Sequence, residues 1–189
     1  MCPYSLARTV GRHEASSLVI AVAQPALVSY DVSANAQTQA AVVRRAGARV
    51  VVFPELSLTG YELDAPLVSP DDPRLAPIIQ ACVAAGALAL VGAPLAGPCI
   101  GMLAVDSSDA TVVYRKINLG AAEAERFVPA QNPAVLAVDG WRLGLAHLQR
   151  HWPSGARRGH RRARHRRVRR RPRRERRRCH RIAGPPDRC

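Results

Sequence analysis

Two regions of this chain place an ionisable side chain where it can take part in catalysis. Glu55 follows an apolar run at residues 50–53 and Pro54, so it stands just past the end of a predicted buried strand. Such strand ends are where α/β folds build their sites. Burial there would raise the pKa of the Glu55 carboxyl group and suit it to general-base work. The alternative is a carboxylate that only caps a loop.

Lys116 leaves a predicted strand at residues 111–114 for a loop, from which an ammonium group can stabilise an oxyanion. It is the only lysine in a chain that has 27 arginines, so a general need for positive charge does not explain it. Glu123 follows and can orient Lys116 or a substrate. The alternatives are a solvated lysine at a strand end and a glutamate in the first turn of a short helix.

Apolar periodicity predicts the elements that would position these residues. Helices are expected at residues 31–46, capped by Ser33 or Asn35, and at residues 70–86. The expected inner face of the second helix consists of Leu75, Ile78, Ile79, Cys82 and Val83. Fully buried strands are expected at residues 18–23, 49–53 and 87–92.

Two hairpins are expected after these elements. The first joins residues 102–106 to 111–114, and the second joins residues 134–138 to 142–146 through Asp139-Gly140-Trp141. An Asp-Gly pair is a strong turn signal. Strands alternating with helices and followed by hairpins are typical of an α/β layered fold with a mixed sheet.

Charge divides the chain sharply. Residues 1–146 contain nine arginines and one lysine against twelve acidic residues, a net charge of −2, whereas residues 147–189 contain eighteen arginines against Glu175 and Asp187, a net charge of +16. A basic segment of this kind predicts non-specific nucleic-acid binding. It has no lysine and a single aromatic residue, Trp152, so the aromatic residues that usually stack on bases are missing.

The cysteine spacing and the apolar runs argue against a metal-binding, secreted or membrane-spanning protein. Five cysteines without metal-ligand spacing favour thiols in a reducing cytoplasm, with Cys82 and Cys99 buried and inert. Residues 1–16 form an N-terminal extension without the apolar region of a signal peptide. No apolar run is long enough to predict a membrane span.

Several motifs occur in a fixed order along residues 17–146. They are Ala23-Gln24-Pro25; Phe53-Pro54-Glu55 with Gly60-Tyr61; Tyr114, Lys116 and Leu119; and Glu123 with Phe127-Val128-Pro129, where Ala130 replaces a glycine. In this order they resemble the nitrilase or carbon-nitrogen hydrolase superfamily. The resemblance implies an α-β-β-α sandwich, of which residues 17–146 form an incomplete first half, followed by a disordered basic tail at residues 147–189.

The resemblance also implies roles. Glu55 would be the general base, Lys116 would stabilise developing negative charge, and Glu123 would support them. The intact parent would hydrolyse a carbon-nitrogen bond of a small amide or nitrile through a cysteine, without a metal or organic cofactor, and would form a homodimer.

The expected cysteine is missing. Residues 140–146 match the first part of the family pattern Gly-x-x-Gly-x-x-Ile-Cys-x-Asp, and alignment of its second glycine with Gly144 places the cysteine near Leu148. Residues 147–152 can be back-translated so that a shift of one base yields Ile-Cys-x-Asp-Thr-Gly, and the same shift turns arginine codons into those of alanine, valine and glycine. We therefore expect an out-of-frame tail and an inactive chain. A nucleic-acid-binding fragment and a non-catalytic scaffold are the alternatives.

The nucleotide sequence across codons 144–155 tests the frameshift. A second reading frame that stays open downstream and encodes Ile-Cys-x-Asp would support it. A downstream sequence that is interrupted by stop codons in that frame would contradict it.

Overall fold

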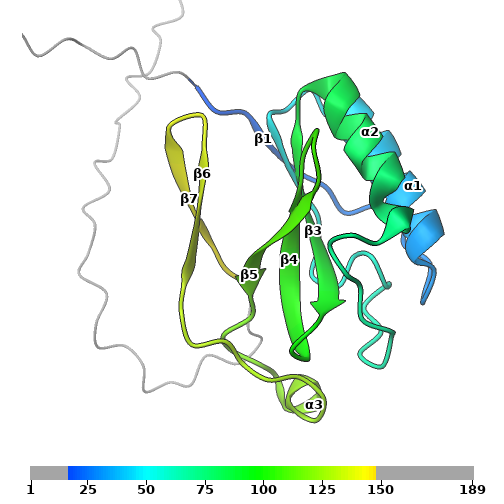
Figure 1. Ribbon diagram of the computed structural model, residues 1–189, viewed down its shortest axis with the longest axis vertical. Helices are drawn as coiled ribbons and strands as arrows, with labels where there is room; N and C mark the ends of the chain where they lie inside the picture. Colours follow the sequence, from blue (N-terminus) through cyan, green and yellow to red (C-terminus); the bar gives the residue numbers. More distant parts are fainter. Residues whose placement is uncertain (1–16, 148–189) are drawn as a thin grey trace, which may run out of the picture. The chain divides into compact units, whose positions relative to one another are not determined.

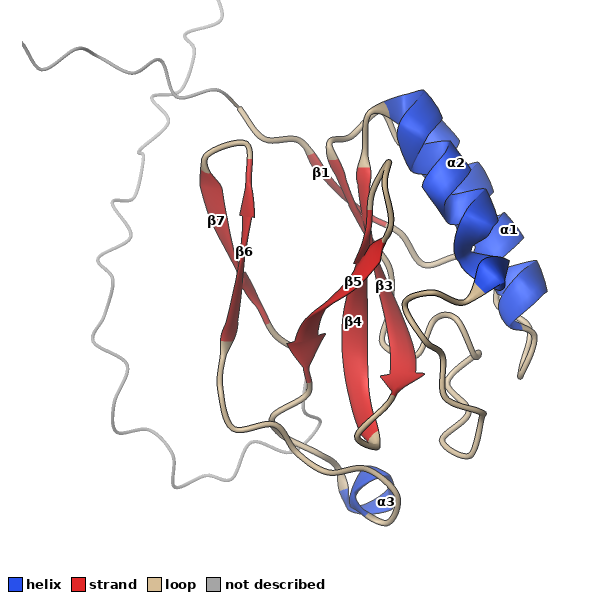
Figure 2. Cartoon of the chain, in the orientation of Figure 1, coloured by secondary structure: helices blue, strands red, loops and turns tan. Residues whose placement is uncertain are grey.

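A computed structural model describes residues 17–147 of the chain. These residues form a five-stranded sheet with two helices on one face and a hairpin on the other (Figures 1 and 2). The sheet strands are β1 (Ile20–Val22), β2 (Val50–Val52), β3 (Leu88–Leu95), β4 (Cys99–Val105) and β5 (Ala110–Arg115). The pairs β1–β2 and β2–β3 are parallel, whereas β3–β4 and β4–β5 are antiparallel. The predicted mixed sheet is confirmed.

The helices and the remaining hairpin complete the described residues. They are α1 (Val32–Arg45), the 3₁₀ turn η1 (Pro73–Leu75), α2 (Ala76–Ala85), the short α3 (Ala121–Ala124), β6 (Ala134–Val138) and β7 (Trp141–Leu145). The hairpin of β6 and β7 turns through Asp139 and Gly140, both with positive φ, as the Asp-Gly signal predicts. No helix among residues 17–147 is long and apolar enough to cross a membrane.

The start of α1 differs from the prediction. Asp31 caps the helix, because its carboxylate accepts a hydrogen bond of 2.9 Å from the backbone nitrogen of Ala34. The predicted caps Ser33 and Asn35 were wrong, because both lie inside the helix. The side chain of Asn35 is instead fully buried.

The second helix ends at Gly86 in the left-handed conformation, with φ of 60°, as predicted. Leu75, Ile78 and Cys82 face the core as expected. Val83 does not, because one further residue turns a side chain by about 100° around an α-helix, and its side chain is 58% exposed.

Apolar residues pack on both faces of the sheet. On one face, Val51, Val91 and Leu103 lie in a core with α1 and α2. On the other face, Leu90 and Met102 pack with residues of the β6–β7 hairpin. The turn of that hairpin is tied to the sheet by Arg49 and Asp139, whose side chains lie 2.8 Å apart.

The edge strand β1 is more exposed than the sequence predicts. Ala21 packs toward the helices, so its neighbours Ile20 and Val22 point to the opposite face. Ile20 is 44% exposed and Val22 is 77% exposed. The prediction of a fully buried strand was wrong here, because β1 has a single partner strand among the described residues and the β6–β7 hairpin does not cover its outer face.

The loop after β2 lies directly on β3 at Gly92. The Leu58 backbone nitrogen donates a hydrogen bond of 3.0 Å to the Gly92 carbonyl, and the Gly92 nitrogen donates one of 3.2 Å to the Ser57 hydroxyl. A Cβ atom on Gly92 would lie 2.5 Å from both the Leu56 nitrogen and the Pro54 carbonyl oxygen. Glycine is therefore required for this close approach, and with it for the position of Glu55.

We expect Gly92→Ala to lower the free energy of unfolding by about 1–3 kcal/mol, because the loop must move away from β3. Gly144→Ala is the matched control, since a Cβ at that strand position meets no atom within 4 Å. Urea unfolding of both variants measures the difference. Equal stability of the two variants would contradict the proposed close contact.

Candidate active site

Buried polar side chains of α1 hold the loop that carries Glu55. The side-chain amide of Asn35 donates a hydrogen bond of 3.1 Å to the Leu58 carbonyl, and that of Gln39 donates one of 2.9 Å to the Ser57 carbonyl. Both side chains are fully buried. They satisfy loop carbonyls that water cannot reach, so the helix fixes the loop in one conformation.

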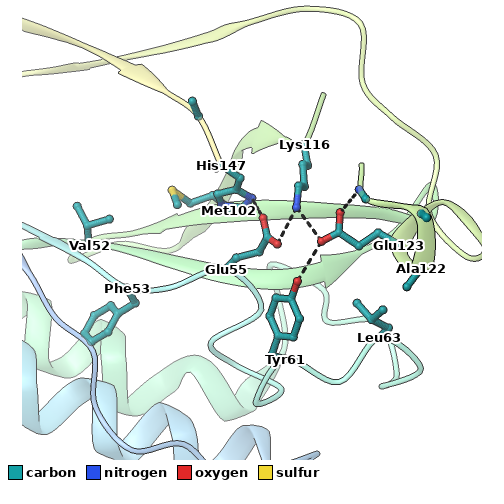
Figure 3. Close-up of a pocket in the computed structure, with 13 residues that line it drawn as sticks. Val52, Phe53, Glu55, Tyr61, Leu63, Met102, Lys116, Ala122, Glu123 and His147 are labelled. Atoms are coloured by element: carbon teal, nitrogen blue, oxygen red, sulfur yellow. Dashed lines mark hydrogen bonds and ion pairs between the residues drawn. The ribbon is translucent and has the colours of Figure 1, made fainter. Parts of the chain in front are cut away.

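Left-handed backbone conformations also shape this loop. Leu56 has φ of 52° and Tyr61 has φ of 66°, values that residues with a side chain seldom adopt. Gly60, with φ of 77°, approaches the backbone of Ser29 so closely that a Cβ would lie 2.9 Å from its Cα. The turn directs Glu55 toward Lys116 and Tyr61 toward Glu123 (Figure 3).

Lys116 lies between two carboxylates. Its Nζ donates hydrogen bonds of 2.7 Å to Glu55 Oε1 and 2.8 Å to Glu123 Oε1 (Figure 3). The Lys116 side chain is only 3% exposed, so the alternative of a solvated lysine at a strand end was wrong. The residue directly follows β5, where its backbone nitrogen donates to the Ile100 carbonyl at 2.7 Å. The strand therefore fixes the base of the side chain.

Glu123 has hydrogen bonds at both oxygens. Oε1 accepts from Lys116 and from the hydroxyl of Tyr61 at 3.2 Å, and Oε2 accepts from the Gly120 backbone nitrogen at 2.7 Å. Glu123 lies in the first turn of the short helix α3, which was one prediction for it. It also accepts a hydrogen bond from Lys116, which is the contact that the other prediction, orientation of Lys116, requires. Because both of its oxygens are held by Lys116, Tyr61 and the Gly120 backbone, Glu123 has the geometry of a residue that positions Lys116.

The pKa values follow from this arrangement. Burial alone lowers the pKa of Lys116, but hydrogen bonds to Glu123 and Glu55 outweigh it and raise the pKa above its usual value. Burial alone raises the pKa of Glu55, but the nearby His147 imidazole and Lys116 ammonium outweigh it and lower the pKa. The predicted upward shift of the Glu55 pKa was wrong in direction. The packing that buries the Glu55 carboxylate also places His147 and Lys116 next to it, and these neighbours lower its pKa.

His147 is the second partner of Glu55. Its Nδ1 lies 2.8 Å from Glu55 Oε2, although the orientation of the ring falls short of hydrogen-bond geometry. The His147 side chain is 6% exposed, and its ring meets that of Tyr114 edge-on, with the ring centroids 5.0 Å apart. Both oxygens of Glu55 therefore have a close partner.

These residues line one cavity of about 730 Å³. Charged and polar side chains gather at one part of its wall, and apolar side chains form the rest (Figure 3). The lining residues are Val52, Phe53, Glu55, Tyr61, Leu63, Met102, Lys116, Gly120, Ala121, Ala122, Glu123, Ala146 and His147.

No cysteine lines this cavity within residues 17–147. Cys82 and Cys99 are buried, and the thiol of Cys82 donates to the Val105 carbonyl at 3.3 Å. Burial raises the pKa of Cys82 to about 11. Their interpretation as buried thiols is confirmed. Across the part of the chain that the structure describes, no group of three or more His, Cys, Asp and Glu side chains is placed to hold a metal ion.

The fold is a partial nitrilase-type α/β fold, as solved structures show. The NitN amidase from Nesterenkonia sp. AN1 matches with a TM-score of 0.58 and 24% identity, over 69% of this chain and 56% of that chain. A glutamine-dependent NAD+ synthetase from Acinetobacter baumannii matches with a TM-score of 0.53 and 19% identity, over 67% of this chain and 27% of that chain. The chain thus spans just over half the length of the amidase.

The carbon-nitrogen hydrolase family model matches residues 19–158. This chain therefore belongs to the carbon-nitrogen hydrolase family. No curated protein matches it. The family match ends at residue 158, beyond the domain boundary predicted at residue 146, and Leu148, the expected position of the nucleophile, lies outside the described residues, as does the predicted basic tail.

Sequence reasoning found three of the five polar side chains of the site. Glu55, Lys116 and Glu123 meet in the structure. Tyr61 was noted within a motif but without a role, although its position on the same short loop as Glu55 is a signal for one. His147 was missed, because only tertiary packing brings this residue, two positions after β7, against Tyr114 of β5 and Glu55.

We expect Lys116→Met to lower the free energy of unfolding by about 3–5 kcal/mol, because two buried carboxylates lose their shared cation. Arg49→Met is the matched control: it also removes a cation paired with a carboxylate, but Arg49 and Asp139 are 40% and 50% exposed, so the cost should stay within about 1 kcal/mol. Denaturant unfolding at neutral pH measures both variants. Similar losses would show that Lys116 does not hold the site together.

Proposed function

We propose that the cavity binds small carboxamides or nitriles, and that this chain does not hydrolyse them. The observation that carries the proposal is the buried Lys116 between Glu55 and Glu123 in a cavity that no described cysteine lines. Family membership supports the chemical class of ligand.

The geometry suggests how such a ligand would bind. An ammonium group has three protons, and Lys116 directs two of them to Glu55 and Glu123. The third can donate a charge-assisted hydrogen bond to a carbonyl oxygen or a nitrile nitrogen. Val52, Leu63 and Met102 line the cavity and offer apolar surface to a short alkyl chain.

An intact parent would use the same residues for catalysis. Glu55 would take the proton of a cysteine thiol, and the thiolate would attack the amide or nitrile carbon. Lys116 would stabilise the negative charge that develops on the ligand. Release of ammonia would leave an acyl-enzyme, which water activated by Glu55 would hydrolyse to a carboxylic acid.

The present chain would stop at binding. Residue 148, where the family pattern expects the nucleophile, is a leucine. Cys82 and Cys99 lie in the core away from the cavity. Loss of a catalytic nucleophile removes several orders of magnitude of rate. An out-of-frame origin of residues 147–189 accounts for both the missing cysteine and the lysine-free run of arginines.

Amide binding to a chain in which a cysteine is replaced has a parallel in a solved structure. A cysteine-to-alanine mutant of the Nesterenkonia amidase is in complex with butyramide. Butyramide is therefore a suitable probe for this cavity.

We expect butyramide to shift the amide resonances of Tyr61, Gly120 and Ala122 in a saturable manner, because these residues line the cavity. Two-dimensional NMR of the labelled full chain measures the shifts. Lys116→Met should abolish them while circular dichroism shows that the variant is folded, and Arg49→Met should retain them. Shifts that do not saturate, or that appear only far from the cavity, would contradict the proposal.

A further inference from the structure

The imidazole of His147 covers one oxygen of the Glu55 carboxylate. Its Nδ1 lies 2.8 Å from Glu55 Oε2, and Oε2 is buried. Both residues belong to the wall of the cavity, where Figure 3 shows the ring beside the carboxylate. Removal of the ring would therefore leave Oε2 open to the cavity.

The contact between His147 and Glu55 supplies no hydrogen bond. Glu55 Oε2 and both ring nitrogens of His147 are buried without a hydrogen-bond partner among residues 17–147. Buried polar atoms in folded proteins usually have such a partner, and an acceptor that lacks one is costly to bury. The imidazole thus shields Oε2 from the cavity without satisfying it, and Oε2 remains an acceptor for any donor that could reach it.

Tyr114, rather than Glu55, holds His147 in this position. The His147 backbone nitrogen donates a hydrogen bond of 3.3 Å to the Tyr114 hydroxyl. The two rings meet edge-on at 76°, with their centroids 5.0 Å apart. Because the hydrogen bond comes from the backbone, a change of the side chain at position 147 preserves it. A small residue there should uncover Oε2 without releasing residue 147 from β5.

Glu55 Oε2 lies next to the position proposed for the ligand. Lys116 Nζ donates to Oε1 at 2.7 Å and is the group proposed to bind a carbonyl oxygen or a nitrile nitrogen. Oε1 and Oε2 are joined through one carbon atom, as are the oxygen and the nitrogen of a carboxamide. A primary carboxamide bound at Nζ therefore brings its N–H groups close to Oε2, whereas a nitrile has no N–H to offer.

We propose that His147 determines the ligand specificity of the cavity, because its ring occupies the place where a carboxamide nitrogen would meet Glu55. With the ring present, carboxamides and nitriles bind through Lys116 alone, and the cavity does not favour the amide. The inference deepens the proposed function and rests on it, since both ligands must enter the cavity.

The size of the effect follows from the charge of the Glu55 carboxylate. A hydrogen bond from a ligand N–H to a carboxylate is charge-assisted, and it is stronger than one between neutral groups even after the exchange with water is counted. Once Oε2 is uncovered, this bond should raise the affinity for butyramide at least about tenfold. Butyronitrile, which has the same propyl group but no N–H, should gain nothing comparable.

Dissociation constants of butyramide and butyronitrile, measured by NMR titration of the labelled full chain, test the proposal. In His147→Ala, we expect the affinity for butyramide to rise at least about tenfold relative to that for butyronitrile. His147→Phe is the matched control that keeps an aromatic ring over Oε2, and Leu63→Ala enlarges the cavity at another part of its wall. Both controls should retain the wild-type ratio of the two affinities.

An unchanged ratio in folded His147→Ala, or an equal rise in His147→Phe, would overturn the proposal; circular dichroism shows whether each variant is folded. The wild-type chain gives an independent test, because a preference for butyramide over butyronitrile of more than about tenfold would overturn the proposal without any variant. Binding of both ligands with a ratio that no variant changes would contradict this inference alone. Failure of both ligands to bind would contradict the proposed function, and this inference with it.

Discussion

A single buried ammonium group joins three segments of this chain. Lys116, at the end of β5, donates to Glu55 in the loop after β2 and to Glu123 in α3. Removing one ammonium and two carboxylates from water is costly, and close geometry with further hydrogen bonds must offset that cost. Tyr61 and the Gly120 backbone supply those bonds to Glu123. The charges of Lys116, Glu55 and Glu123 sum to −1.

The sheet provides the rigidity that this cluster needs. β2 and β5 are not neighbours, so the positions of Glu55 and Lys116 depend on the intervening strands β3 and β4. Gly92 of β3 lets the Glu55 loop lie against the strand, and buried amides of α1 hold the loop from the other side. Packing outside the cavity thus fixes the positions of Glu55 and Lys116 within it.

Local signals in the sequence were sufficient for the elements and for three site residues. Apolar runs located the strands, Asp139-Gly140 located a hairpin turn, and ordered motifs located Glu55, Lys116 and Glu123. Local signals do not show which distant segments of the chain pack against one another. The exposure of β1, the contact of His147 with Glu55 and the downward pKa shift of Glu55 all depend on which segments meet in space. The cap at Asp31 was missed for a local reason, since several neighbouring residues can cap a helix.

The central proposal is that Glu55 and Lys116 would serve as the base and the lysine of a carbon-nitrogen hydrolase in a cavity that no cysteine of residues 17–147 lines. Ammonia release from butyramide, measured in parallel for the wild-type chain and Leu148→Cys, tests it most directly. The account predicts no release by the wild-type chain above the rate without protein, and release by the cysteine variant that depends on Lys116. Turnover of butyramide by the wild-type chain, at more than one equivalent of ammonia per chain, would contradict it.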